Sequence, residues 1–362
     1  MPTIKQIAKL AGVSTATVSR VVNSKPGVAA ETQKKVQKII KRYQYKPSAA
    51  ARSLVTKRSH SIGLLLSDIT NPAYAELANA IEQEARKSNY VVIFFSTGND
   101  LKLQKRGIDF LREKQVDAII FASVFLHNPE VEKLAGEGFP LVLVNRRLEH
   151  DIASYVVMDD VLGGYKATEH LIKLGHRRIG MISGPISYST GSERMEGYRK
   201  ALREYHIPID RKLIKMGDFR KNSGYIAGEQ FIRMAHRPTA IFAANDYMAI
   251  GAFEVISDKG LRVPEDIAIV GNDDVEWASF GGIRPTTIRG DKLEMGKKTM
   301  QLVLKKLQTG KTNDLYHIVL DPKLIIRDSC GYQRKKQEGG EKIGRSASSG
   351  IEDASEKKRI SI

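Results

Sequence analysis

The stretch VSTATVSRVVN, residues 13–23, places two kinds of side chain on opposite sides of one predicted helix. Its later valines recur at spacings of three and four, which predicts a buried face. Thr15, Ala16 and Arg20 remain on the other side. Threonine and alanine methyl groups can contact thymine methyls, and an arginine can bond guanine at two points. Such a face can contact DNA bases or be an ordinary helix surface, and the spacing alone leaves the choice open.

The charge of the chain is concentrated around this stretch. The 362 residues carry a net charge of +17, and residues 1–60 alone hold 13 Lys or Arg against one acid, Glu31. Residues 61–330 are close to neutral, with a net charge of +2. A solvated basic face is the plain interpretation, but so one-sided a segment is typical of phosphate binding. The first 60 residues are predicted to bind nucleic acid.

Three short helices are predicted to position this surface. Thr3 and Gln6 have the spacing of a capping box at the start of the first helix. Gly12 permits a tight turn, and Ser14 can cap the second helix. A third helix is expected over residues 30–43, with a buried stripe of Val36, Ile39, Ile40 and Tyr43. The order helix, four-residue turn, helix, supporting helix is typical of a helix-turn-helix domain.

A linker and an α/β region follow. YKPSAAARSLVTKRS contains a short helical stretch that would be marginal alone. From Ser61, Val- and Ile-rich runs alternate with amphipathic stretches, which predicts nine or ten mostly parallel strands covered by helices. That many strands predict two doubly wound halves, and Pro322 marks a crossing between them. Residues 331–362 are rich in Gly, Ser and charge, and we expect disorder there.

Few residues favour catalysis. The eight histidines are scattered without metal-ligand spacing, and no Gly-rich nucleotide cradle occurs, so we expect no catalytic residue, metal or cofactor. GNDD and AAND place acids where strands are expected to end, the edge at which open α/β sheets bind ligands. Such an acid can bind a ligand, cap a helix or catalyse. Without a partner nucleophile, binding is the favoured interpretation.

The expected cellular compartment follows from the lack of a membrane-spanning stretch or a leader pattern and from the single cysteine. There is no stretch of ~18 apolar residues and no cleavable leader pattern. The single cysteine, Cys330, excludes an internal disulfide and suits a reducing compartment. We expect a cytoplasmic protein that does not enter a membrane.

Successive motifs resemble those of the LacI/GalR family of bacterial transcription regulators. They include TIKQIAKLAGVSTATVSRVVN, YKPSAAARSL, SIGLLLSDITNPAY, HLIKLGHRRIGMISGP, RPTAIFAANDYMAIGA and GLRVPEDIAIVGNDD, in family order over residues 3 to about 330. The resemblance implies a helix-turn-helix domain (1–46), a hinge helix and linker (47–60) and a two-subdomain core (61–330) like that of periplasmic sugar-binding proteins. The N-subdomain would comprise about 61–160 and 292–321, and the C-subdomain about 161–290 and 322–330.

The resemblance also implies roles in DNA binding. Positions matching Thr15, Ala16 and Arg20 read bases in the family, with the second helix in the major groove. Thr17 and Ser19 would contact phosphates or serve only as helix-surface residues. Leu54 would be the hinge wedge that opens a base step in the minor groove, assisted by Arg52.

A ligand pocket between the two core halves is implied as well. Its residues would be Asn71, Tyr74, Asn145, Arg146, Thr190, Arg194, Phe219, Asn245 and Asp273. The set suits a sugar, because aromatic rings can sandwich its apolar face while Arg, Asn and Asp bond its hydroxyls. Individually, Asn71 or Asn245 could instead be a helix cap, and Tyr74 or Phe219 a core aromatic residue.

The sequence departs from the family pattern at two positions that affect which ligand we expect. Tyr188 makes a purine less favoured, although Thr190 is compatible with one, and Lys292 leaves room for an acidic or phosphorylated sugar.

A homodimer is expected rather than a tetramer, because the tail has no heptad pattern. A sugar-binding module or enzyme without a DNA role, and a nonspecific nucleoid-type binder, are the alternatives.

Overall fold

The computed structural model describes residues 2–45, 58–275 and 284–332, which divide into two units. The first unit contains residues 1–61 together with 113–117, and the second contains nearly all the rest. Most of the expected hinge, including Arg52 and Leu54, and nearly all of the expected disordered tail lie outside the described residues.

The N-terminal helices are α1 (Ile4–Ala11), α2 (Thr15–Val22) and α3 (Ala30–Arg42). The capping box forms as predicted, since the Gln6 carboxamide accepts from the Thr3 backbone N–H at 2.7 Å and the Thr3 hydroxyl accepts from the Gln6 N–H at 3.4 Å. Gly12 takes the left-handed conformation (φ 64°) that ends α1. The Ser14 hydroxyl accepts from the Thr17 N–H at 3.1 Å and so begins α2.

One small core holds these helices together. Its buried members come from all three helices: Ile7, Ala8, Ala11, Val18, Val21 and Val36. One expectation was wrong, because Tyr43 is 42% exposed. The helix ends at Arg42, so Tyr43 leaves the helical path, and Tyr45 packs against the core instead.

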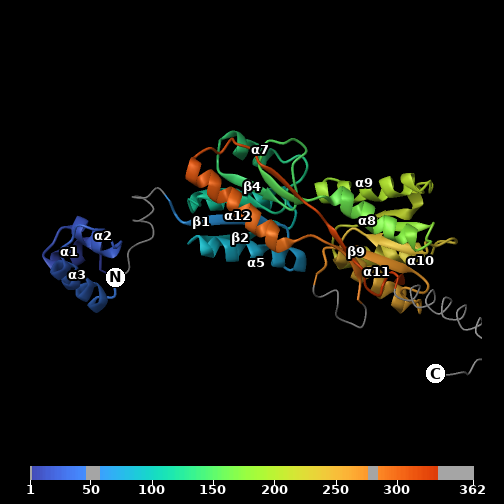
Figure 1. The fold of residues 1–362 in the computed structure, drawn as a ribbon, viewed down its shortest axis with the longest axis horizontal. Helices are drawn as coiled ribbons and strands as arrows, with labels where there is room; N and C mark the ends of the chain where they lie inside the picture. The colour runs from blue at the N-terminus through green and yellow to red at the C-terminus, as the bar shows by residue number, and fades with distance from the viewer. Residues whose placement is uncertain (1, 46–57, 276–283, 333–362) are drawn as a thin grey trace, which may run out of the picture. The chain divides into compact units, whose positions relative to one another are not determined.

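The second unit contains two six-stranded sheets, and we call the two halves the first and second lobes (Figure 1). The first sheet has the order β11-β5-β4-β3-β1-β2. Its strands are β1 (Ser61–Leu66), β2 (Val91–Ser96), β3 (Ala118–Phe121), β4 (Leu141–Val144), β5 (Tyr155–Met158) and β11 (His317–Leu320). The first-lobe helices are α5 (Pro72–Lys87), α6 (Leu101–Glu113), α7 (Pro129–Gly136) and α12 (Lys292–Thr309).

The second sheet has the order β12-β10-β9-β8-β6-β7. Its strands are β6 (Ile179–Ser183), β7 (Ile214–Met216), β8 (Ala240–Ala243), β9 (Ala268–Asn272), β10 (Thr286–Arg289) and β12 (Lys323–Ile325). The second-lobe helices are α8 (Asp160–Lys173), α9 (Ser189–Glu204), α10 (Lys221–Ile232) and α11 (Asp246–Asp258), with a 3-10 turn at Arg211–Leu213. Only β12 pairs antiparallel among the strand registers of this lobe.

The described residues thus contain twelve strands, more than the nine or ten expected. The strand β10 escaped prediction because its four residues, TTIR, include a single aliphatic side chain. Pro322 stands between β11 of the first sheet and β12 of the second, as the break in the apolar pattern predicts.

Glycines let the second-lobe helices approach closely. A Cβ added at Gly197 of α9 would lie 2.1 Å from the Val161 carbonyl oxygen of α8, and one at Gly251 of α11 would lie 2.0 Å from the Lys221 carbonyl oxygen of α10. At both positions the added Cβ would overlap a backbone oxygen of the neighbouring helix. A residue larger than glycine therefore fits only if one of the helices shifts. The packing fixes α9, which carries Thr190 and Arg194, and α11, which begins directly after Asn245.

No helix within residues 2–45, 58–275 and 284–332 is long and apolar enough to cross a membrane.

Candidate functional site

The structure exposes the face of α2 that the sequence singles out. Thr15, Ala16 and Arg20 are exposed, whereas Val18 is fully buried in the helical core. The same valine spacing that predicts the helix therefore leaves these three side chains free to meet a partner. This geometry fits base recognition, which stays a prediction for each residue.

Thr17 and Ser19 have partners within the domain. The Thr17 hydroxyl lies 2.9 Å from the Ser14 hydroxyl, and the Asn23 amide nitrogen lies 2.9 Å from the Ser19 carbonyl oxygen and 3.4 Å from its hydroxyl. Both residues thus help to close the ends of α2, in line with the plainer of their two predicted roles.

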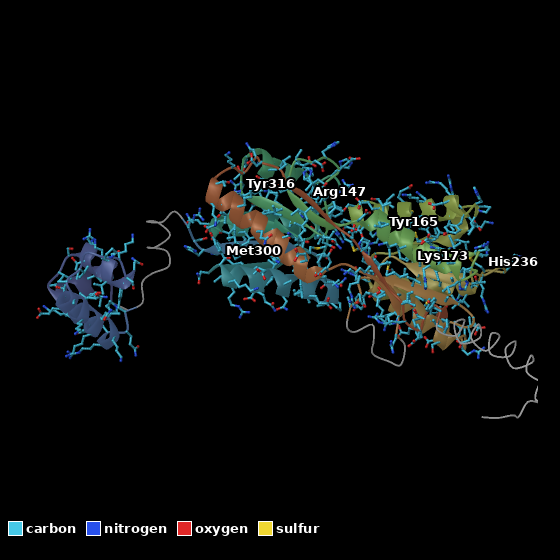
Figure 2. All side chains as sticks on the ribbon, viewed as in Figure 1. Arg147, Tyr165, Lys173, His236, Met300 and Tyr316 are labelled. Atoms are coloured by element: carbon cyan, nitrogen blue, oxygen red, sulfur yellow. The ribbon has the colours of Figure 1, made fainter. Side chains whose placement is uncertain are left out.

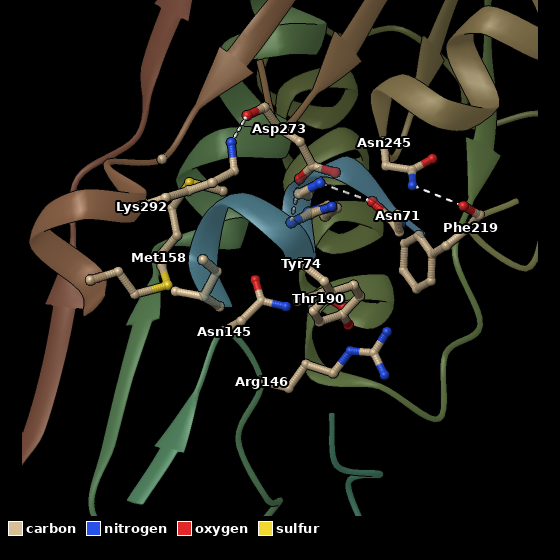
Figure 3. A pocket seen from close by; sticks show the side chains of 15 residues that line it. Asn71, Tyr74, Asn145, Arg146, Met158, Thr190, Phe219, Asn245, Asp273 and Lys292 are labelled. Carbon is tan, nitrogen blue, oxygen red and sulfur yellow. Dashed lines mark hydrogen bonds and ion pairs between the residues drawn. The ribbon is translucent and has the colours of Figure 1, made fainter. Parts of the chain in front are cut away.

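All nine predicted ligand residues line one pocket in the second unit (Figure 3). They come from segments far apart in the chain, and most follow the carboxyl ends of parallel strands, as for Asn145 after β4 and Asp273 after β9. The free space in this pocket is about 50 Å³. Typical ligand pockets measure ~300–1,000 Å³, so the structure shows the pocket in a closed form.

Arg194 is the most firmly held pocket residue. It is 4% exposed, its Nε donates to Asp160 Oδ1 at 2.7 Å, and its guanidinium lies 3.7 Å from Asp273 Oδ1. A guanidinium fixed by two carboxylates cannot rotate away from the pocket. It can present its remaining N–H groups to ligand oxygens.

Lys292 closes another side of the pocket. Its Nζ donates to the Asp273 backbone oxygen at 2.5 Å (Figure 3). It also donates to Glu76 Oε2 at 2.9 Å. Lys292 was not among the predicted ligand residues, nor were five further lining residues: Ala73, Leu77, Met158, Gly290 and Met295. Met158 is the last residue of β5. Its position at the carboxyl end of a strand was the feature of the sequence that could have indicated it as a pocket residue.

Arg146 sits among aromatic rings. Its guanidinium carbon lies 3.8 Å from the centre of the Tyr188 ring, 5.5 Å from that of Phe219 and 5.9 Å from that of Tyr74. Its Nη1 donates to Ser123 Oγ at 3.2 Å. Tyr74 and Phe219, expected to sandwich a sugar, flank this arginine in the closed form.

Both pocket asparagines at helix starts are also caps. Asn71 Oδ1 accepts from the Ala73 N–H at 3.1 Å, and Asn245 Oδ1 accepts from the Met248 N–H at 2.9 Å. Asn245 in addition donates to the Phe219 carbonyl oxygen at 3.0 Å. Capping fixes each side chain at the pocket wall, so the structural role and the binding role are compatible.

Three pocket residues adopt a left-handed backbone that is uncommon for non-glycine residues. The φ angles are 67° at Asn145, 68° at Phe219 and 117° at Asp273. Such conformations cost ~1–3 kcal/mol each and cluster at functional sites. Sequence patterns gave no signal of this strain.

Two acids close to the pocket have raised pKa values. Burial, followed by the charge of Asp160, raises the pKa of Glu193 to about 7, although Arg147 lies 2.7 Å away. Burial also raises the pKa of Asp246 to about 7, while a hydrogen bond from the Thr287 hydroxyl at 2.7 Å acts in the opposite direction. Within the described part of the chain, no group of three or more His, Cys, Asp or Glu could hold a metal ion.

A basic helix-turn-helix unit and a two-lobed core with a polar pocket define a DNA-binding protein under the control of a small molecule. Comparison with known proteins agrees. Residues 3–48 match the bacterial regulatory proteins of the lacI family, and residues 59–312 match the periplasmic binding proteins and sugar binding domain of the LacI family.

Relatives match along most of their length. The HTH-type transcriptional repressor PurR of Actinobacillus pleuropneumoniae serotype 3 and the ribose operon repressor of Haemophilus influenzae are each 35% identical, over 91% of this chain and 98% of theirs. Among solved structures, the Lac repressor dimer bound to operator and an anti-inducer has a TM-score of 0.80 at 27% identity, covering 91% of this chain and 99% of that one. The regulator CelR in complex with cellobiose has a TM-score of 0.70 at 32% identity, covering 91% and 100%.

The chain belongs to the LacI family. It is a helix-turn-helix transcriptional regulator with an effector-binding core, and not an enzyme. The resemblance, the fold class and the functional class predicted from the sequence are confirmed.

Proposed function

We propose that this protein is a cytoplasmic repressor that binds operator DNA as a homodimer and responds to a sugar or sugar derivative in the core pocket. The observation that carries the ligand part is the convergence of all nine predicted residues on one pocket. The relatives named above include a ribose operon repressor and a cellobiose-bound regulator, which supports a carbohydrate. The PurR relatives keep a purine as the alternative effector.

The DNA part rests on the exposed face of α2. Thr15, Ala16 and Arg20 would read bases, and Thr17 and Ser19 would act at the helix ends or on phosphates. Arg52 and Leu54, which lie outside the described residues, would act in the minor groove. The proposed domains are the helix-turn-helix domain (1–46), the hinge helix and linker (47–60) and the effector-binding core (61–330).

Coupling between the two activities would run through lobe movement. With about 50 Å³ free, the pocket has to widen to admit a sugar, and separation of the lobes would widen it. A ligand that binds one lobe arrangement better shifts the population toward it, and a coupling of ~1–3 kcal/mol suffices for regulation.

A thermal-shift panel tests the ligand, using neutral sugars, sugar acids, sugar phosphates and purines on the wild type and on Asp273→Ala. A ligand at ~100 times its dissociation constant adds ~2.7 kcal/mol of stability. We expect a sugar-class hit that Asp273→Ala abolishes. A purine as the sole hit would replace the carbohydrate proposal.

DNA binding is tested with operator selected from a random pool. Leu54→Ala should keep the ligand affinity and lose most of the specific operator affinity. Unchanged operator binding by this variant contradicts the hinge role. Equal affinity for operator and scrambled DNA at ~0.15 M salt would favour the nonspecific nucleoid-type binder.

A further inference from the structure

Arg146 is a buried cation without an acidic partner. It is 2% exposed, and no carboxylate of the described residues lies within 4 Å of its guanidinium. Asp68 and Asp218 line a neighbouring hollow together with Arg146 but form no ion pair with it: Asp68 accepts from the Thr70 hydroxyl at 2.6 Å, and Asp218 accepts from the Arg220 N–H at 2.9 Å. An unpaired charge in such a place is costly, so a partner from outside the chain would relieve it.

The other two cations of the pocket are satisfied. Arg194 has Asp160 at 2.7 Å, and Lys292 has Glu76 at 2.9 Å. Arg146 is therefore the one of these three pocket cations that forms no ion pair with a described residue, and it lies where the first lobe faces aromatic rings of the second lobe.

The Nε of the guanidinium is left for this partner. Arg146 donates from Nη1 to Ser123 Oγ at 3.2 Å and to Asn99 Oδ1 at 3.3 Å, and it is also hydrogen-bonded to the Tyr188 hydroxyl. Its Nε is buried and has no hydrogen-bond partner. The edge formed by Nε and Nη2 is one that binds carboxylate or phosphate through two parallel bonds.

The aromatic surroundings strengthen the argument. Tyr188 and Phe219 are 4% and 9% exposed, and both lie against the guanidinium. Ring faces attract a cation without removing its charge, and they exclude water from it. An anion arriving there would interact in a low dielectric, where its attraction to arginine is stronger than in water.

We propose that the effector carries an anionic group, a carboxylate or a phosphate on a sugar, which binds the Nε–Nη2 edge of Arg146. This inference rests on the proposed function, because it names the chemical class of the ligand for the same pocket. Charged hydrogen bonds of this kind should favour the anionic sugar over its neutral counterpart by about 10- to 100-fold in affinity.

The first test uses inorganic phosphate and acetate as probes, with chloride keeping the ionic strength constant. Thermal unfolding of the full chain should shift upward with either probe, and Arg146→Gln should remove the shift. Arg112→Gln is the control, since this first-lobe arginine is paired with Glu137 at 2.9 Å and lies outside the pocket lining. A probe-dependent shift that is equal in wild type and Arg146→Gln overturns the proposal, and so does the absence of any shift.

The second test compares matched sugars by calorimetry: glucose with glucuronate and glucose 6-phosphate, and galactose with galacturonate. Tighter binding of a uronate or of the sugar phosphate, lost in Arg146→Gln and kept in Arg112→Gln, supports the proposal and distinguishes carboxylate from phosphate. Equal or tighter binding of the neutral sugar overturns the anionic class while leaving the regulatory function intact. Phosphate dependence through Arg146 without binding of any sugar would instead contradict the carbohydrate part of the proposed function.

Discussion

Replacing Glu193 with glutamine should change how stability depends on pH. Glu193 lies on α9 of the second lobe, and its Oε1 is 2.7 Å from Nη2 of Arg147, which lies where the two lobes face each other (Figure 2). Burial is the main cause of its raised pKa, about 7 against the ordinary 4.5, and the nearby charge of Asp160 adds to it. The folded protein therefore holds a proton that the unfolded chain has already released.

The sign of the effect follows from that difference. Between pH 4.5 and pH 7 the folded state binds more protons at this site, so the contribution of Glu193 to stability is full below pH 4.5 and is lost as the pH rises through 7. At 1.36 kcal/mol per pKa unit, the complete loss is about 3 kcal/mol. Glutamine mimics the protonated acid and does not titrate, so Glu193→Gln should gain about 2–3 kcal/mol relative to wild type between pH 5 and pH 8.

Urea unfolding followed by circular dichroism at pH 5, 6, 7 and 8 measures this difference. Other acids titrate in both proteins alike and cancel in the comparison. Glu196→Gln, at an exposed position on the same helix, controls for the loss of one carboxylate. A difference between wild type and Glu193→Gln that is constant from pH 5 to pH 8 would refute the reasoning, because it would mean that burial does not hold a proton on this acid.

Three further substitutions test the framework around the pocket. Gly251→Ala should lower the unfolding free energy by about 1–3 kcal/mol or more, because its Cβ would lie 2.0 Å from a backbone oxygen; urea unfolding checks this, and Gly136→Ala, with nothing within 4 Å, should be nearly neutral. Asp160→Asn should cost about 3–5 kcal/mol in the same assay, because it leaves Arg194 buried with its nearest carboxylate removed, and a cost below ~1 kcal/mol would contradict that view. Ser14→Ala should weaken the start of α2 by about 0.5–2 kcal/mol, measured as faster amide hydrogen exchange in that helix.

The fold could be predicted because its signals are local and repeated. The α2 helix follows from valine spacing and the Ser14 cap, and both are present as expected. Parallel strands buried on both faces appear as aliphatic runs, such as AIIF and LVLV. The strand β10 and the exposure of Tyr43 escaped because each depends on tertiary context: a neighbour for a threonine-rich strand, and the exact residue at which a helix ends.

The pocket could be predicted only through resemblance to a family, with the strand-end rule as support. That rule indicates Asp273 and Asn245, but it says nothing of Arg194, which reaches the pocket from within α9. Nor does a linear pattern show that Arg146 lacks an acidic partner, because that depends on side chains from both lobes. The charge balance of the pocket is a property of the folded molecule.

Contacts between the lobes give the closed form its own free energy, which any ligand has to work against or add to. The Leu126 N–H donates to the Ser187 carbonyl oxygen at 2.8 Å, and the Arg147 N–H donates to the Ser189 hydroxyl at 3.1 Å beside the ion pair with Glu193. These bonds hold the lobes together, while the buried Arg146, which forms no ion pair with a described residue, opposes closure. An anion bound at Arg146 would remove that opposition and so favour the closed arrangement. A ligand of this class would therefore act by completing the charge balance between the lobes, and the neutral analogue would fill the same space without shifting the equilibrium as far.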